Sequence, residues 1–148
     1  MLMQSGRMDQ ALFQFQRCVD AAPRNAANHN NLGMILTNMG RTAEAVAAYR
    51  KAVRLDPGYA KGWVGLTLGL LQVPDYEGAA AAARKAIQIE PRIPEAYLNL
   101  SLGLLESGQV EESIVEMRRG LAVAPDHAAL RSTMLIAMNY RDALTPQE

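Results

Sequence analysis

Apolar residues recur along the chain with helical spacing, in two alternating patterns. The first pattern places apolar residues at i, i+3 and i+7, which is one face of a helix. It occurs at Leu32 and Leu36, then at Trp63, Leu66 and Leu70, then at Tyr97, Leu100 and Leu104. The second pattern places small residues and one larger side chain on a single face. It occurs at Ala11, Phe15, Cys18 and Val19, at Ala45, Tyr49, Ala52 and Val53, at Ala79, Ala83, Ala86 and Ile87, and at Ser113, Met117, Gly120 and Leu121. The alternation predicts pairs of helices that approach closely through their small residues.

Four prolines divide the chain at a constant interval of 34 residues. They are Pro23, Pro57, Pro91 and Pro125. A fixed period of this length is typical of stacked helical repeats, and each proline ends a helix because the preceding residue disfavours the α region. Helix breakers also separate the two helices inside each unit: Gly40, Pro74 and Gly108, with Gly6 at the equivalent place near the N-terminus. The fold class predicted is therefore all-α, a right-handed α-solenoid of antiparallel helix pairs.

The period predicts one array over residues 1–148. A half-repeat that supplies only a second helix covers 1–25, full repeats cover 26–59, 60–93 and 94–127, and a terminal helix with a tail covers 128–148. The ends of a solenoid need a polar outer face, yet several apolar residues would be partly uncovered there. These self-association candidates are Phe13, Val19, Met134, Leu135 and Met138. Either the chain is a fragment of a longer array, or the ends associate with each other, or flanking residues fold over them.

Two positions of the repeat depart from the pattern in some units. His29 and Arg131 stand where the other units have an aromatic residue early in the first helix, which predicts weaker packing there. Ala83 stands where the other units have Phe15, Tyr49 or Met117. Unless Trp63 fills that volume, Ala83 marks the loosest contact in the array.

The repeated motifs resemble those of the tetratricopeptide repeat family. Residues 59–66 (YAKGWVGL) and 95–101 (EAYLNLS) are similar to its first-helix motif, and residues 40–45 (GRTAEA) resemble the opening of its second helix. The resemblance covers almost the whole chain. It implies a superhelix whose concave surface holds peptides or helices of partner proteins.

Composition and charge exclude several classes of function. Fifteen basic and fifteen acidic residues cancel, so no basic field is present to drive nucleic-acid binding. Cys18 is the only cysteine, so an internal disulfide or a cysteine zinc site is impossible. No apolar stretch is long enough for a membrane helix, and the start lacks the features of a signal peptide. We expect a soluble, cytoplasmic protein.

No pattern of catalytic or metal-binding residues is found. His29 and His127 lie far apart without paired partners, and no Ser-His-Asp set, phosphate loop or metal spacing accompanies them. Cys18 aligns with Ala52 and Ala86, which predicts a small core residue. We expect no catalytic site, no metal and no cofactor.

The informative surface is the side of the first helices that points away from the core. At 100° per residue, two rows of residues lie on this side. The row opposite the core holds Asn31, Met34, Asn38, Lys61, Gly65, Leu68, Glu95, Asn99, Leu102 and Ile136. The flanking row holds Asn30, Val64, Leu71, Leu98 and Leu105. The leucines form an apolar patch on a surface that would otherwise be wet, which indicates a binding surface. For the flanking row, packing between neighbouring first helices is an equally good interpretation. The predicted groove comprises Asn31, Met34, Asn38, Lys61, Val64, Leu68, Leu71, Glu95, Leu98, Asn99, Leu102, Leu105 and Ile136.

The family resemblance also carries roles for some groove residues. Asn31 and Asn99 match the position whose asparagine commonly holds the backbone of a bound peptide, and Gly65 interrupts that ladder. The basic clamp with which one branch of the family grips acidic chaperone tails does not fit, because only Lys61 could serve and Glu95 faces it. An amphipathic helix or an apolar extended segment suits the leucines better.

The leading interpretation is a non-catalytic scaffold that binds a protein or peptide segment in the concave groove. One alternative is a structural module that self-associates through its terminal helices, giving a homo-oligomer. Another is a recognition domain of a larger transferase-type enzyme, because such enzymes of the broad family carry similar arrays.

Overall fold

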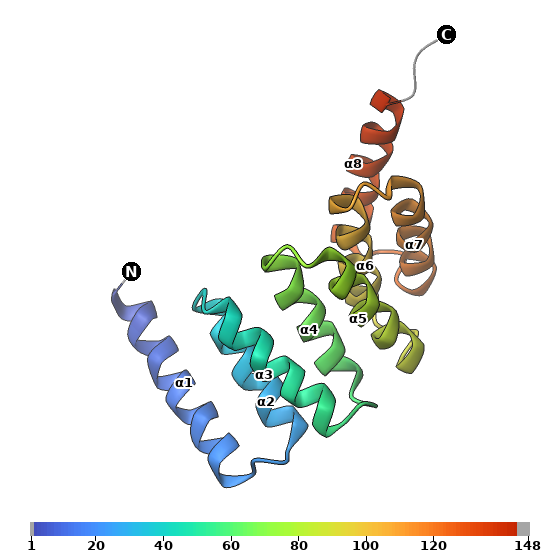
Figure 1. Cartoon of the computed structure of the whole chain (residues 1–148). Coiled ribbons are helices and arrows are strands. Elements are labelled where there is room, and N and C mark those ends of the chain that lie inside the picture. The colour runs from blue at the N-terminus through green and yellow to red at the C-terminus, as the bar shows by residue number, and fades with distance from the viewer. Residues whose placement is uncertain (1, 145–148) are drawn as a thin grey trace.

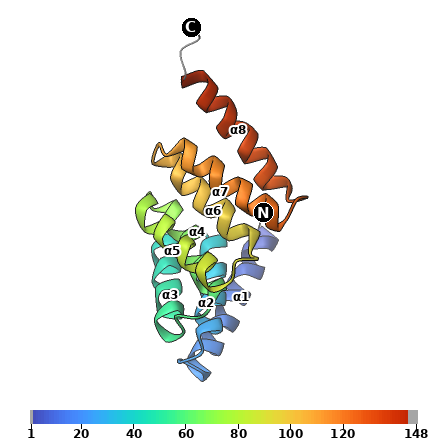
Figure 2. The ribbon, with the colours of Figure 1, turned by 90° about the vertical axis from the view of Figure 1, so that its right-hand side faces the viewer.

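The computed structural model describes the backbone of residues 2–144 and the side chains of residues 6–142. Met1 and the tail at 145–148 lie outside the described residues. Within them the chain forms eight helices: α1 (Leu2–Ala21), α2 (Ala26–Asn38), α3 (Thr42–Leu55), α4 (Ala60–Gln72), α5 (Tyr76–Ile89), α6 (Pro94–Glu106), α7 (Val110–Val123) and α8 (Ala128–Leu144). They follow one another in a curved row, with α8 extending at the C-terminal end (Figures 1 and 2). The all-α solenoid predicted from the periodicity is confirmed.

The helices form two layers of different character. Within each pair the helices pack together, as α2 with α3, α4 with α5 and α6 with α7. The first helices α2, α4, α6 and α8 also contact their neighbours along the array. Among the described residues, no two of the second helices α1, α3, α5 and α7 come within 8 Å of each other between Cα atoms. The layer of first helices is therefore the tighter one and forms the inner, concave side.

Small residues produce the close approach within each pair, as the second pattern predicts. Eight residues of this pattern in α3, α5 and α7 are at most 1% exposed: Ala45, Tyr49, Ala52, Ala79, Ala83, Ala86, Ser113 and Met117. In α7 the contact includes polar atoms, because the Ser113 hydroxyl donates to the carbonyl of Ser101 in α6 at 2.8 Å. Serine can therefore occupy the position of an alanine here, because its buried hydroxyl group is hydrogen-bonded.

The prolines that set the period also accept a repeated hydrogen bond. The residue six positions after each of the first three prolines donates to its carbonyl: His29 Nε2 to Pro23 at 2.8 Å, Trp63 Nε1 to Pro57 at 2.9 Å, and the Tyr97 hydroxyl to Pro91 at 3.0 Å. His29 is only 8% exposed, so the weaker packing expected there is not found. Imidazole has the ring and the N–H that this position uses. Arg131 differs and pairs with Asp126 instead, at 3.0 Å.

Glycines end two of the first helices, whereas a third glycine does not. Gly40 and Gly108 have φ of 72° and 80°, the left-handed conformation that closes a helix, as predicted. Gly6 was expected to break the chain in the same way, but it lies inside α1. A single glycine inside a helix costs only about 0.5–1 kcal/mol relative to alanine, so the helix continues through it.

The second-helix face of α1 is more exposed than the same face of the other units. Cys18 is exposed, which corrects the prediction of a core residue. In α7 the same position is Gly120, where a Cβ atom would lie 2.7 Å from Tyr97 of α6, the first helix of the same unit. No helix precedes α1 among the described residues. Phe13 and Leu135 are exposed as expected, at 61% each, and Met134 and Met138 are half-buried against the core. Val19 is buried rather than uncovered, because it has the register of Val53 on the side of α1 that packs against α2.

None of the helices in the described part of the chain is long and apolar enough to cross a bilayer.

Candidate functional site

A pocket of about 520 Å³ lies on the inner side of the array, between α2, α4 and the turn that leads into α6. Four apolar side chains line it: Met34, Val64, Leu68 and Ile93. Four charged side chains surround them: Lys61, Glu90, Arg92 and Glu95. Asn30, Tyr49, Gly65 and Pro94 complete the lining. We call this set of twelve residues the inner pocket.

The inner pocket brings together part of the predicted groove. Met34, Lys61, Val64, Leu68 and Glu95 belong to both sets. Of these, Met34 and Leu68 present the most apolar surface, at 52% and 40% exposure.

The other predicted residues lie outside the pocket. Leu98 and Leu105 are half-buried and pack against the core, as Leu71 does further back in the array. For these three flanking residues, packing between helices is the interpretation that the structure favours. Of the remainder, Asn99 is buried, Asn31 and Leu102 are half-buried, and Asn38 and Ile136 are exposed.

Several lining residues were missing from the predicted groove. Asn30 lies on the flanking row, but a polar residue there adds nothing to an apolar patch, so the pattern of leucines does not indicate it. Tyr49 belongs to the core of α3, and only the position of its ring brings it to the pocket. Glu90, Arg92 and Ile93 lie in the turn at 90–93 between α5 and α6, which the periodicity of helix faces does not describe. The one available signal was Pro91, since the turn after each framing proline leads into the next first helix.

Tyr49 forms the wall of the pocket on the side of α3, and its ring packs against two glycines. A Cβ atom at Gly33 would lie 2.7 Å from Tyr49 Cε1, and one at Gly65 would contact the same ring atom even more closely. The ring therefore fits between α2 and α4 only because both positions are glycine. The Tyr49 hydroxyl lies 3.3 Å from Thr37 Oγ1, and burial raises the pKa of Tyr49 above its ordinary value.

Asn30 places an unsatisfied polar atom at this wall. Its side chain is 5% exposed, and its Oδ1 is buried without a hydrogen-bond partner, the only such atom found among the described side chains. Its Nδ2 lies 3.8 Å from the Met34 sulfur, a weak acceptor. Buried acceptors without a partner are rare in folded proteins.

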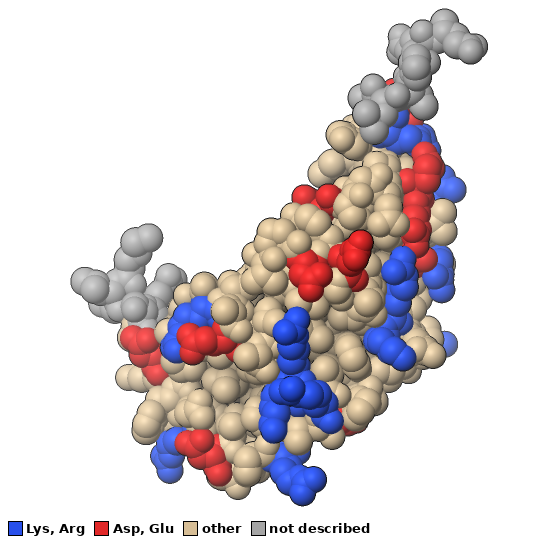
Figure 3. All heavy atoms as spheres, in the orientation of Figure 1, with Lys and Arg blue, Asp and Glu red and all other residues tan. Residues whose placement is uncertain are grey.

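The charges around the inner pocket are balanced and unpaired. Lys61, Glu90, Arg92 and Glu95 form no ion pair within residues 6–142. Figure 3 shows a similar mixture of charges over the whole visible face, where basic and acidic side chains are interspersed without a field of one sign. The pocket thus offers apolar surface at its centre and charges of both signs at its rim.

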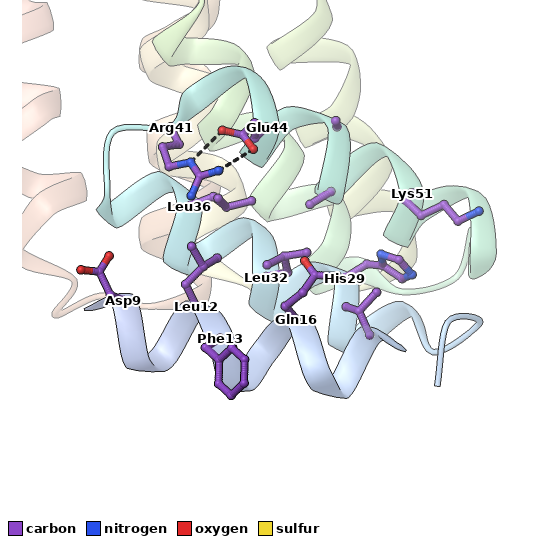
Figure 4. Close-up of a pocket in the computed structure, with 13 residues that line it drawn as sticks. Asp9, Leu12, Phe13, Gln16, His29, Leu32, Leu36, Arg41, Glu44 and Lys51 are labelled. Carbon is purple, nitrogen blue, oxygen red and sulfur yellow. Dashed lines mark hydrogen bonds and ion pairs between the residues drawn. The ribbon is translucent and has the colours of Figure 1, made fainter. Parts of the chain in front are cut away.

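A second cavity, of about 640 Å³, lies on the outer side between α1 and α3 (Figure 4). Leu12, Leu32 and Leu36 form its apolar floor, and Phe13 lies at its rim. Arg41 at its edge is already paired with Glu44 at 2.7 Å, which raises the pKa of Arg41 and lowers that of Glu44. None of the described side chains lining this cavity has a buried polar atom without a partner, as Asn30 does. The inner pocket is therefore the better candidate site.

No group of three or more histidine, cysteine or carboxylate side chains in the described region could hold a metal ion.

Models of the tetratricopeptide repeat match residues 26–59 and 70–137. The chain belongs to the tetratricopeptide repeat family. Members of this family are generally protein-interaction modules and are usually non-catalytic. No curated protein shows significant similarity to the chain.

Several solved structures share the fold at low sequence identity. MamA is 20% identical, with a TM-score of 0.83 over 95% of this chain and 82% of that one. The thermophilic repeat protein TTC0263 from Thermus thermophilus is also 20% identical, with a TM-score of 0.80 over 95% and 77% of the two chains. The first repeat domain of Spaghetti (RPAP3), bound to an HSP90 peptide, is 15% identical, with a TM-score of 0.76 over 80% and 94%. At these identities the likeness establishes the fold alone.

Proposed function

We propose that the chain is a non-catalytic scaffold that binds a segment of a partner protein in the inner pocket. The observation that carries the proposal is the exposed apolar surface of Met34 and Leu68 on the concave side, next to a buried acceptor without a partner. Exposed apolar side chains gathered in a hollow are typical of interaction sites. Family membership supports the same class of function.

The chemistry of the pocket favours an apolar segment over an acidic one. The structural neighbour Spaghetti (RPAP3) was solved with the HSP90 peptide SRMEEVD, whose sequence contains two glutamates. In the inner pocket, Glu90 and Glu95 stand beside Lys61 and Arg92, so an acidic segment meets repulsion as well as attraction. Burial of an apolar side chain against Met34 and Leu68 supplies attraction without regard to charge.

The proposal is tested with peptides selected from a random phage-displayed library on the immobilised wild-type protein. Dissociation constants of the selected peptides are then measured by fluorescence anisotropy for Leu68→Asp and for the control Val115→Asp. Val115 is 51% exposed on α7, in the outer layer, so the control makes the same change away from the pocket. Circular dichroism verifies that both variants keep their helices.

We expect Leu68→Asp to weaken binding at least tenfold, because the burial of one leucine contributes about 1.5–3 kcal/mol. Val115→Asp should leave the affinity unchanged. If Leu68→Asp binds the selected peptides as tightly as the wild type, the pocket is not the binding site.

A further inference from the structure

We infer that the partner segment leaves the inner pocket between Lys61 and Glu90, and that it carries an acidic and a basic residue beside its apolar anchor to pair with these two side chains. The inference rests on the proposed function and names the chemistry of the ligand. The occupant is a segment of mixed charge, neither wholly apolar nor of one sign.

The inner pocket has a smaller neighbour at the edge of the array. Lys61 and Glu90 line both the inner pocket and this second hollow of about 420 Å³, so they lie at the boundary between the two. We call the second hollow the edge hollow, and its other lining residues are Gly58, Tyr59, Ala60 and Ile89. A segment that is anchored in the inner pocket and continues into the edge hollow therefore passes both charged side chains.

Both side chains are available to a ligand. Lys61 and Glu90 are exposed, and within the described part of the chain neither takes part in an ion pair or a side-chain hydrogen bond. Asp56 has the register of Glu90 one unit earlier, and it accepts the backbone N–H of Gly58 at 2.9 Å. Glu90 has no such local role.

The signs of the two charges are opposite to those that the helix ends favour. A helix carries a partial positive charge at its N-terminal end and a partial negative charge at its C-terminal end. Lys61 lies in the first turn of α4, and Glu90 is the C-cap of α5. In α6 the register of Lys61 holds Glu95, which has the favoured sign. Helix stability therefore explains neither Lys61 nor Glu90, whereas a ligand that pairs with both explains them together.

The two charges select for a ligand that has both signs. Lys61 and Glu90 come from different elements and are not paired with each other, so each can bind a separate group of the ligand. A wholly acidic segment is repelled by Glu90, and a wholly basic one is repelled by Lys61. Charges at the rim of an interface contribute specificity more than affinity, and the apolar anchor supplies the affinity.

The test reverses charges on the protein, with peptides selected on the wild type as probes. The variants are Lys61→Glu, Glu90→Lys and the double variant. The matched controls are Arg92→Glu and Glu95→Lys, which reverse the two charges of the inner pocket that do not line the edge hollow. We expect Lys61→Glu and Glu90→Lys each to weaken binding about three- to tenfold, because an exposed pair changes from attraction to repulsion. The controls should change the affinity less than about twofold.

A peptide with exchanged charges shows whether the pairing is direct. The selected peptide is resynthesised with its acidic residue replaced by lysine and its basic residue replaced by glutamate. This peptide should bind the double variant about as tightly as the original peptide binds the wild type. In about 1 M salt, where the Debye length is about 3 Å, the differences between the peptides should largely disappear.

Stability gives a second readout that separates binding from folding. Each reversal places the favoured sign at its helix end, so the Tm of Lys61→Glu and of Glu90→Lys should equal or exceed that of the wild type. A lower Tm, together with binding that the exchanged peptide does not restore, would show that the two charges stabilise the fold and would overturn the inference.

The remaining outcomes separate the inference from the function on which it rests. If no peptide is recovered, or if Leu68→Asp binds normally, the proposed function fails and the inference fails with it. If peptides bind at the pocket but carry no pair of opposite charges, the inference alone is overturned. It is also overturned if the controls weaken binding as much as Lys61→Glu and Glu90→Lys do.

Discussion

Two neighbouring repeats place very different volumes at the same position of their second helices. In α3 the position is Tyr49, and in α5 it is Ala83. Both side chains are at most 1% exposed. The first helices compensate for the difference: Tyr49 lies against Gly33 of α2 and Gly65 of α4, whereas the same registers around Ala83 hold Thr67 and Asn99, which are themselves buried.

The two repeats show that volume is conserved across the contact between helices and not at a single position. A large residue on the second helix accompanies glycines on the first helices, and a small one accompanies larger partners. Trp63 packs against both core clusters, one of which contains Ala83. Protein interiors are close-packed in this way because each void forfeits dispersion contacts.

The difference between Tyr49 and Ala83 also bears on the location of the inner pocket. Gly65 accommodates the Tyr49 ring, and both residues line the inner pocket together with Asn30. One unit further along, the register of Gly65 holds Asn99, which is buried. The inner pocket thus includes the tyrosine by which α3 differs from α5.

The largest expected effect comes from Tyr49→Ala. Removing a buried aromatic side chain from between two glycines leaves a cavity that neither neighbour can fill. We expect the free energy of unfolding to fall by about 3–5 kcal/mol, measured by urea denaturation. The matched control is Tyr140→Ala, which removes a tyrosine that is 56% exposed on α8 and should change stability by less than about 0.5 kcal/mol. Similar losses for both variants would contradict the packing described here.

A smaller effect is expected where the volumes are reversed, in Ala83→Leu. Overpacking a full contact costs about 1–3 kcal/mol, so this variant should be less stable than the wild type. Adding Thr67→Gly reproduces the arrangement around Tyr49, and the loss in the double variant should be smaller than the sum of the two single losses by about 0.5–3 kcal/mol. Thermal denaturation of the four proteins measures this coupling. A single variant more stable than the wild type would instead reveal a gap at Ala83.

Much of the array could be predicted because its determinants are local and repeated. The prolines, the small residues of the second helices and the breakers at Gly40 and Gly108 act within one unit, so their spacing can be read along the chain. The predictions of a helix break at Gly6 and of a core position for Cys18 were wrong. Both residues share the repeat register of the other units, but their surroundings differ from those in the other units. A register predicts the face of a helix and not what covers that face.

The inner pocket was harder to predict, because it depends on contacts between units. Met34 and Leu68 follow from helical periodicity, since they point away from the core. Asn30 and Tyr49 line the pocket only because Gly65, in the next unit, lets the ring and the amide lie side by side. The turn at 90–93 ends the unit that contains Gly65, and Pro94 and Glu95 come from a third unit. Such an arrangement needs the stacking geometry, which the pattern of one unit does not contain.

The smallest effect separates the packing role of a glycine from its helix propensity. Gly65→Ala puts a Cβ atom against the Tyr49 ring and 3.0 Å from Asn30 Oδ1. Alanine favours the helix more than glycine does, but the steric cost of the new Cβ atom is larger. We therefore expect a net loss of about 1–2 kcal/mol in the free energy of unfolding. Gly6→Ala makes the same change inside α1, where a Cβ atom meets nothing within 4 Å. That variant should gain about 0.5–1 kcal/mol, because alanine loses less backbone entropy than glycine when a helix forms. Urea denaturation of both variants measures the contrast in sign. A gain at both positions would show that the Tyr49 ring can move aside, in which case its packing does not require a glycine at position 65.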